Sequence, residues 1–403
     1  MIPFSPPRVD DQTITAVTEV LKSGWITTGP VTKQFEQDLA EYLNLPKVLC
    51  LNSWTNAAEL FLRWYGIKEG DEVIVPAYTY SASCNILFHL GATPVLVDCA
   101  PNSFHIDIKS LEEKITAKTK VIMPVDIGGF PCDYESISKL IERKKNLFHA
   151  SSPSQEILGR ILLFSDAAHS LGSKINDKPT ALFADVSCYS FHAVKNLTTA
   201  EGGALAFNLP NGFDYELIYK ELNIMSLHGQ TKDALSKTTS GGWKYDITSA
   251  GYKCNMTDLQ AAIGAVELER YENSTLPKRK KICMHYHESF SAQTWYISPP
   301  LSLENSQTSY HLFQLRIKSF TEQQRDEAME LLKAAGVSTN VHFMPLPLFS
   351  FYQKQGFKMA DYPNAFHVYA NEISLPVFYD LSEEQMRTVS SAVVKVINQV
   401  LGV

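Results

Sequence analysis

Short apolar runs recur along the first half of the chain, and polar or amphipathic segments separate them. Between residues 47 and 208 these runs predict seven β-strands, at 47–51, 71–76, 93–98, 120–126, 160–166, 186–191 and 202–208. The intervening segments predict helices at 56–65, 81–90, 108–115 and 134–144. Strands that are apolar on both faces and alternate with helices indicate an α/β fold with a mainly parallel central sheet flanked by helices.

The pattern changes after about residue 265. A long helix is predicted there, followed by shorter alternating elements, at 271–290, 312–317 (strand), 322–335, 339–342 (strand) and 383–401. Before the change, the polar segment 146–160 is typical of a surface loop. We therefore expect a large domain over 1–265 that begins with an N-terminal arm (1–30), and a smaller α/β C-terminal domain over 266–403.

Composition narrows the class of protein. The chain has 36 basic and 43 acidic residues, a net charge of −7 without blocks of like charge, which argues against binding nucleic acid or a membrane surface. Its seven cysteines are scattered without metal-ligand spacing, so we expect buried thiols and no metal site. No signal-like start or membrane-length apolar run occurs, and we expect a cytoplasmic protein.

Polar residues follow several predicted strands directly. They form a hydroxyl-rich helix start around Ser53 and Thr55, an aromatic pair that includes Tyr80, and the carboxylate of Asp166. Ser190 ends a further strand, and Lys195 follows it closely. Ligands of parallel sheets bind at the carboxyl ends of the strands, so these residues should converge on one edge.

Lys195 has unusual surroundings for a lysine, in the run SFHAVKNLTTAEGGA (190–204). The ordinary pKa of lysine is about 10.4, so a nucleophilic lysine needs an apolar or cation-rich site, which this run supplies. A buried Asp166 needs a partner, for which a pyridinium N–H is suited. Ser53, Thr55 and Ser190 could hold a phosphate. Pyridoxal 5′-phosphate (PLP), bound to Lys195 as a Schiff base, meets all of these needs.

Each of these features has an ordinary structural explanation when taken alone. A strand-terminal Asp such as Asp166 is commonly a capping or turn residue, and hydroxyl residues before a helix commonly cap it. An isolated Tyr80 is commonly packed at a rim. Their joint order along the strand ends is what favours a cofactor site.

Several longer segments are specific to one family. They are SGWITTGP (23–30), GDEVIVPAYTYSAS (70–83), GATPVLVD (91–98), SDAAHSLG (165–172), SFHAVKNLTTAEGG (190–203), GYKCNMTDLQAAIG (251–264), VHFMPLP (341–347) and ISLPVF (373–378). With these segments the chain resembles, nearly end to end, the DegT/DnrJ-type sugar aminotransferases, which have the type I fold of PLP-dependent transferases.

The resemblance implies a role for each matching residue. Lys195 would form the Schiff base, Asp166 would pair with the pyridine nitrogen, Tyr80 would stack on the ring and His169 would lie near the phenolic oxygen. The cofactor phosphate would be held by Ser190 and by the segment Ser53, Trp54 and Thr55. Many members have glycine at the position of Trp54, so the indole must point away or the loop must sit differently.

The resemblance also implies a homodimer with shared active sites. Lys253, in GYKCNM, would reach the phosphate bound by the neighbouring subunit. Many members have an arginine where this chain has Asn255, which leaves open what binds the donor carboxylates. Substrate-side positions would be Thr28, His311, His342 and Phe343.

The implied reaction transfers an amino group from L-glutamate to a keto sugar on UDP, dTDP or GDP, with 2-oxoglutarate released. The segments 227–234, 251–258 and 341–347 resemble enzymes that act at C4 of 4-keto-6-deoxy sugars, whose products enter O-antigen, capsule or glycan assembly. A C3 aminotransferase is the alternative. In the related 3-dehydratases a histidine replaces the lysine, so Lys195 argues against that activity. A PLP-binding sensor and a cofactor-free Schiff-base aldolase are further alternatives, and the aldolase leaves Asp166 unexplained.

Overall fold

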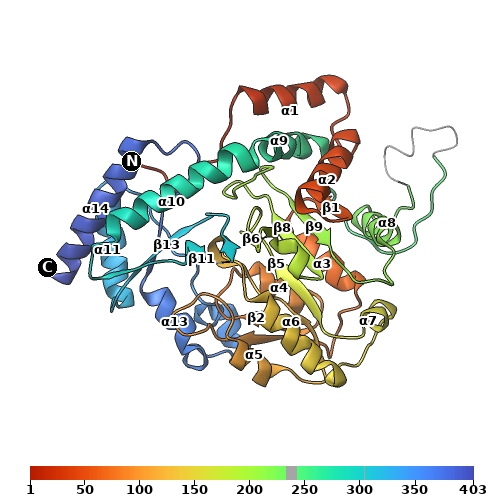
Figure 1. Cartoon of the computed structure of the whole chain (residues 1–403). Coiled ribbons are helices and arrows are strands. Elements are labelled where there is room, and N and C mark those ends of the chain that lie inside the picture. The colour runs from red at the N-terminus through yellow and green to blue at the C-terminus, as the bar shows by residue number, and fades with distance from the viewer. Residues whose placement is uncertain (233–242, 304) are drawn as a thin grey trace.

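The computed structural model describes residues 1–232, 243–303 and 305–403 (Figure 1). Its centre is a seven-stranded sheet in the order β1-β9-β8-β5-β4-β2-β3. All of its neighbouring pairs are parallel except those of β9, which runs antiparallel to both β1 and β8. The predicted mainly parallel sheet is confirmed, with strands at Lys47–Leu51 (β1), Glu72–Pro76 (β2), Thr93–Val97 (β3), Thr119–Ile122 (β4), Leu162–Asp166 (β5), Val186–Ser190 (β8) and Gly203–Phe207 (β9).

Helices cover both faces of this sheet. Alternate residues of β1 show the division, because Leu49 and Leu51 pack with α3 (Trp54–Trp64), α4 (Ala82–His89) and α8 (Tyr215–Ser226), whereas Val48 and Cys50 pack with α2 (Pro30–Leu43) and α9 (Asp258–Glu269). Towards β3, the second face is covered by α5 (Ile108–Lys114) and α6 (Tyr134–Arg143). The four helices predicted between the strands are therefore present.

The C-terminal part forms a second hydrophobic core. It surrounds an antiparallel sheet of β10 (Tyr296–Ile297), β13 (Phe313–Ile317) and β14 (Glu372–Leu375), packed against α10 (Leu276–Phe290), α11 (Glu322–Ala334) and α14 (Glu383–Leu401). Figure 1 shows α10 running from α9 towards the side of the molecule where both termini lie. Residues of α12 (Ser350–Lys354) and α13 (Pro363–Ala370) pack into the core of the large sheet. The domain boundary at residue 265 stays a prediction.

The remaining elements lie at the periphery. The N-terminal arm contains α1 (Asp11–Ser23), capped by Asp10 at its start and by Gly24 in the left-handed conformation at its end. A four-stranded sheet joins two distant segments in the order β11-β12-β6-β7. Its strands are short, at Lys174–Ile175 (β6), Lys178–Pro179 (β7), Ser302–Leu303 (β11) and Ser306–Gln307 (β12).

Three local predictions need correction. The segment 146–160 contains a helix, α7 (Pro153–Leu158), which begins after the cap Ser152 and ends at Gly159. The expected strand at 339–342 is wrong, because only Asn340 forms a bridge there, with Ser374 of β14. The expected helix 271–290 begins with a π-helical turn over 271–275, followed by α10 with Pro277 in its first turn.

All seven cysteines are buried. Among the described residues, no group of three or more histidine, cysteine, aspartate or glutamate side chains is arranged to hold a metal ion. No helix in the described ranges is long and apolar enough to cross a membrane. The cytoplasmic location stays a prediction.

Candidate active site

Lys195 and Asp166 come together from neighbouring strands. Asp166 is the last residue of β5, and Lys195 lies in the loop between β8, which pairs with β5, and β9. Burial lowers the pKa of the Lys195 amine to about 8, although the nearby Asp166 carboxylate opposes this shift. An amine with this pKa is partly neutral near physiological pH, as a nucleophile or proton acceptor requires.

The Asp166 carboxylate is almost completely buried and is held by two donors. Ser83 Oγ donates to its Oδ2 over 2.7 Å, and the backbone N–H of Ala168 donates to its Oδ1 over 3.2 Å. Burial raises the pKa of Asp166 to about 6, and the Ser83 hydrogen bond partly offsets that rise. A buried carboxylate with few donors is suited to receive a further cationic N–H.

Two histidines, His169 and His311, lie beside this pair, with ring centroids 4.3 Å apart and their planes tilted by 43°. The backbone N–H of Gly128 donates to His169 Nδ1 over 3.1 Å, so the proton of the neutral ring is on Nε2. His311 Nδ1 lies 2.8 Å from Asn196 Oδ1, while the Asn196 amide donates to Ser309 O, so His311 carries its proton on Nδ1. Burial, with the Lys195 charge, holds the pKa of both rings well below the usual range.

Aromatic side chains continue the site from the C-terminal part. The Phe343 ring lies 5.8 Å from His169 and 5.7 Å from Tyr80, and the His342 ring lies 5.1 Å from Phe343. The Tyr80 side chain is 61% exposed, so a face of its ring is open to a ligand. Burial and the Lys195 charge lower the pKa of His342 to about 3.

The predicted phosphate segment lies where β1 and β8 end and β9 begins. Gly203 of β9 pairs with both Leu51 and Ser190, so the start of α3 and the end of β8 lie on either side of it. A Cβ at Gly203 would be 2.4 Å from Trp54 N, so only glycine permits this approach. Ser53 caps α3 through Asn56 N, and Thr55 is half-buried. Ser190 Oγ accepts a long hydrogen bond (3.4 Å) from His192 N.

The structure shows where the bulky side chain of Trp54 lies. Its side chain is buried in the core, and its Nε1–H donates to Cys188 O over 3.0 Å. The indole therefore points away from the start of α3, which is the first of the two arrangements expected from the sequence. A contact with a ligand at this position falls to the backbone N–H of Trp54, one of the first amides of α3, which have no acceptor within the helix.

The segment 251–256 runs beside the end of β1 of its own chain. Asn255 bridges to Leu51, and Asn52 N donates to Cys254 O over 2.8 Å. The exposed Lys253 amine donates to Asn255 Oδ1, and Asn255 Nδ2 donates to Thr28 Oγ1. Thr28 is buried and its hydroxyl donates to Met256 O, so these contacts tie the N-terminal arm to this segment. The ligand contacts expected of Thr28 and Lys253 stay predictions.

The family model of the DegT/DnrJ/EryC1/StrS aminotransferases matches residues 7–394. The chain belongs to this family. It is 34% identical to SpsC of Bacillus subtilis, a spore coat polysaccharide biosynthesis protein, over 97% of this chain and 96% of that protein. The predicted family, type I fold and enzyme class, a PLP-dependent sugar aminotransferase, are confirmed.

Solved structures show the same relationship. The aminotransferase is similar to Spr1654 of Streptococcus pneumoniae, assigned as a sugar aminotransferase and solved in a PMP form, with a TM-score of 0.96 and 45% identity over 99% of this chain and 100% of that one. The PLP form of Spr1654 matches with a TM-score of 0.95. PseC of Helicobacter pylori, an aminotransferase involved in pseudoaminic acid biosynthesis, matches with a TM-score of 0.85 and 27% identity over 99% of each chain.

The side chains of this aminotransferase fit PLP. The Asp166 carboxylate is buried beside Lys195, where it can pair with a pyridine N–H, and the Tyr80 ring is open for stacking. The start of α3 and Ser190 supply donors for a phosphate, which the positive end of a helix favours. The cofactor prediction is confirmed by the family and its PLP-bound relatives. The roles of individual residues stay predictions.

Sequence reasoning missed the residues that orient the site. Ser83, Asn196 and Gly128 each hold a predicted site residue, although none was singled out. Ser83 carried a signal, because it lies three residues after Tyr80, one turn further along the chain. Asn196 follows Lys195 directly, but nothing in the sequence indicates that it contacts His311.

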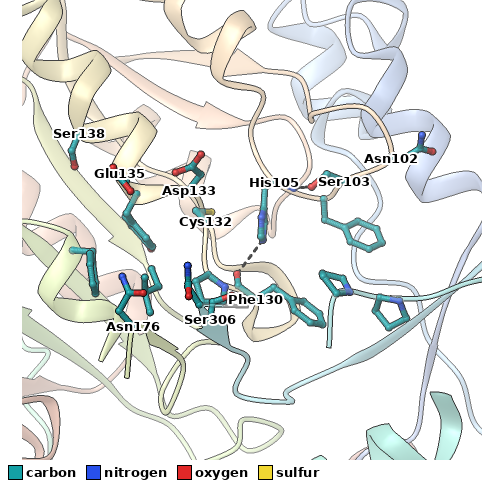
Figure 2. Close-up of a pocket in the computed structure, with 18 of the residues that line it drawn as sticks. Asn102, Ser103, His105, Phe130, Cys132, Asp133, Glu135, Ser138, Asn176 and Ser306 are labelled. Atoms are coloured by element: carbon teal, nitrogen blue, oxygen red, sulfur yellow. Dashed lines mark hydrogen bonds between the residues drawn. The ribbon is translucent and has the colours of Figure 1, made fainter. Parts of the chain in front are cut away.

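A separate cavity of about 960 Å³ lies between α6 and the C-terminal part (Figure 2). Its wall includes His105, which hydrogen-bonds Phe130 O, together with Asp133 and Asn176. None of the predicted site residues lines it. The cavity and the catalytic chemistry thus lie in different places, and the lysine, carboxylate and histidines around Lys195 mark the candidate active site.

Proposed function

We propose that this enzyme transfers the amino group of L-glutamate to C4 of a nucleotide-linked 4-keto-6-deoxy sugar. The observation that carries the proposal is the partly neutral Lys195 amine, set beside Asp166 and three histidines whose pKa values are all lowered. Uncharged imidazoles exchange hydrogen bonds with hydroxyl and keto oxygens without imposing a charge, which suits a sugar ring.

The residues divide the chemistry between them. PLP, when bound, supplies the electron sink for bond breaking at the α-carbon of the donor. Lys195 Nζ, as a free base, accepts the α-proton of the donor and later returns a proton to the sugar carbon. Asp166 keeps a positive charge at the pyridine nitrogen favourable, because the buried carboxylate gains a charged partner there.

The product belongs in polysaccharide assembly, such as capsule or O-antigen. This part of the proposal is supported by the similarity to SpsC, whose name places it in spore coat polysaccharide biosynthesis. The C4 assignment relies on the segments 227–234, 251–258 and 341–347. Of the first, residues 233 and 234 lie outside the described residues.

The donor and the sugar can be tested separately. L-Glutamate alone should convert the absorbance of the holoenzyme from the PLP to the PMP form, whereas L-aspartate should do so far more slowly. The PMP form should then return to the PLP form with a 4-keto sugar on UDP, dTDP or GDP, and NMR of the product should show the amine at C4. Amination at C3 would favour the alternative position, and no return with any keto sugar would contradict the sugar assignment.

The proposed homodimer shares its active sites through Lys253. Each variant, Lys195→Ala and Lys253→Ala, should be nearly inactive alone. A refolded mixture should regain activity, because a mixed dimer contains one site with both native residues. The mass measured by sedimentation should be twice that of one chain. No regained activity in a mixture that demonstrably exchanges subunits would show that Lys253 acts within its own chain.

A further inference from the structure

His342 is held by hydrogen bonds at every polar atom except one. Its backbone N–H donates to Glu372 Oε2 over 3.0 Å, and its carbonyl accepts from Tyr78 OH and Gln314 Nε2, both over 2.6 Å. Its ring Nδ1 lies 2.9 Å from Ser374 Oγ. Within the described part of the chain, no hydrogen bond is made to Nε2.

The orientation of the ring is also fixed. Phe4 stacks on the imidazole with a centroid distance of 5.4 Å and an interplanar angle of 20°, and Phe343 packs edge-on against it. The ring therefore cannot turn freely to exchange Nδ1 for Nε2. The lowered pKa of His342 shows that the ring is neutral at physiological pH, so it carries a single proton on one nitrogen.

Ser374 connects this ring to a buried acid. Its Oγ lies 2.5 Å from Glu372 Oε1, and both side chains are fully buried. The three groups thus form one hydrogen-bonded chain, from Glu372 through Ser374 to His342 Nδ1. A hydroxyl has one proton, so Ser374 can donate to only one of its two neighbours at a time.

We propose that Glu372, acting through Ser374, sets which imidazole nitrogen of His342 carries the proton. When Glu372 is a carboxylate, Ser374 donates to it and accepts from His342 Nδ1–H, which leaves Nε2 as a bare acceptor. When Glu372 is protonated, its Oε1–H donates to Ser374, Ser374 donates to Nδ1, and the ring proton is on Nε2. His342 then offers a substrate either an acceptor or a donor. That consequence for turnover rests on the proposed function.

The surroundings of Glu372 allow both states near neutral pH. Burial raises its pKa to about 8, although Ser374 and the His342 N–H both stabilise the charged form. The nearby Arg316 and Arg325 do not pair with it: their guanidinium groups bind Asn371, Asn102, Tyr369 and acidic residues of α11. Tyr78 also faces it, with a pKa well above the usual range. Of the three hydrogen-bonded groups, Glu372, Ser374 and His342, it is therefore Glu372 that titrates near neutral pH.

We call the hydrogen-bonded groups Glu372, Ser374 and His342 the relay. At its His342 end, the groups that face the imidazole ring are Lys195, His169 and His311. The tautomers of His169 and His311 are fixed by Gly128 and Asn196, as described above, and not through Ser374. The Lys195 charge lowers the pKa of His342 but makes no hydrogen bond with its Nδ1. Whether His342 Nδ1 carries the ring proton therefore depends on Ser374 alone.

The tautomer can be read directly from ¹⁵N chemical shifts of the imidazole in histidine-labelled holoenzyme, assigned by comparison with His342→Gln. In the native enzyme the proton should move from Nε2 to Nδ1 as the pH rises from 6 to 9. In Glu372→Gln it should stay on Nε2 at every pH, because the His342 N–H requires the amide oxygen and the amide NH₂ then donates to Ser374. The proposal would be overturned if the His342 tautomer of the native enzyme did not change with pH and were the same as in Glu372→Gln.

Two variants of Ser374 distinguish loss of the hydroxyl from a change in packing. Ser374→Ala should abolish the pH-dependent exchange, and Ser374→Thr, which keeps the hydroxyl, should restore it. With a keto sugar that the enzyme accepts, Ser374→Ala should raise KM about two- to tenfold, the range for one lost hydrogen bond, with a smaller change in kcat. Equal losses in both Ser374 variants would contradict the relay. The NMR result needs no sugar, so failure of the sugar assignment leaves it interpretable.

Discussion

Ser83 Oγ donates to Asp166 Oδ2 over 2.7 Å, although the two residues lie on α4 and β5 and are 83 positions apart. Thr79 Oγ1 lies 3.0 Å from the same hydroxyl, so a second buried hydroxyl fixes the rotamer of Ser83. The carboxylate is therefore oriented before the cofactor binds. A preoriented carboxylate loses less conformational entropy when it pairs with a pyridine nitrogen.

Ser83→Ala should weaken PLP affinity about tenfold, in the range for a lost hydrogen bond to a charged group. Without the hydroxyl, the pKa of Asp166 rises further and its charged form becomes less available. Fluorescence titration of the apoprotein with PLP measures the change. Ser81→Ala is the matched control, because the Ser81 side chain caps nothing at the start of α4. Equal affinities of Ser83→Ala and the native protein would show that Asp166 needs no orienting donor.

Asp166 should make PLP binding depend on pH. Its pKa is about 6 in the folded protein, above the ordinary value of 3.8, so its contribution to stability is full below 3.8 and is lost as the pH rises through 6. A cationic partner removes that loss, so the rise in Tm on adding PLP should grow between pH 5 and pH 7. Thermal melts of Asp166→Asn should lack this growth, while any change near pH 8 from Lys195 should remain. An unchanged profile in Asp166→Asn would assign the ring nitrogen to another residue.

Lys195→Ala should abolish amino transfer while the protein remains folded. With the cofactor removed, the variant should also melt at a higher temperature than the native protein below pH 8. The reason is that the folded state lowers the pKa of this amine from 10.5 to about 8, so charging it opposes folding. The difference should shrink between pH 8 and 10.5. Calorimetry across this range checks the stability effect, and retained turnover would refute the role of Lys195.

Gly203→Ala should displace the start of α3 and reduce PLP affinity more than it reduces helix content. The added methyl would lie 2.4 Å from Trp54 N and 2.5 Å from Ser53 C, and backbone atoms cannot move aside without shifting the helix. Gly70→Ala is a useful control, because its methyl meets no atom and only its positive φ is strained. Titration with PLP and circular dichroism separate the two effects. Similar PLP affinities of both variants would show that this close approach does not shape the phosphate segment.

The sequence by itself determined the strands of the large sheet, the helices between them and the family. These features depend on short-range patterns, because an apolar run or a helix cap such as Ser53 is defined by residues a few positions away. Lys195 and Asp166 were predicted for the same reason, since each follows a recognisable strand in a specific motif.

The tertiary structure alone decided the partners of the polar side chains. Trp54 donates to Cys188 O, 134 positions along the chain, and Ser374 Oγ lies beside the His342 ring, 32 positions away. The expected strand at 339–342 failed because only Asn340 of that segment forms a bridge to β14, and its local sequence does not show how far the segment runs beside that strand. A buried polar group takes whichever partner the folded chain brings within hydrogen-bond distance, and no local pattern of residues specifies that partner.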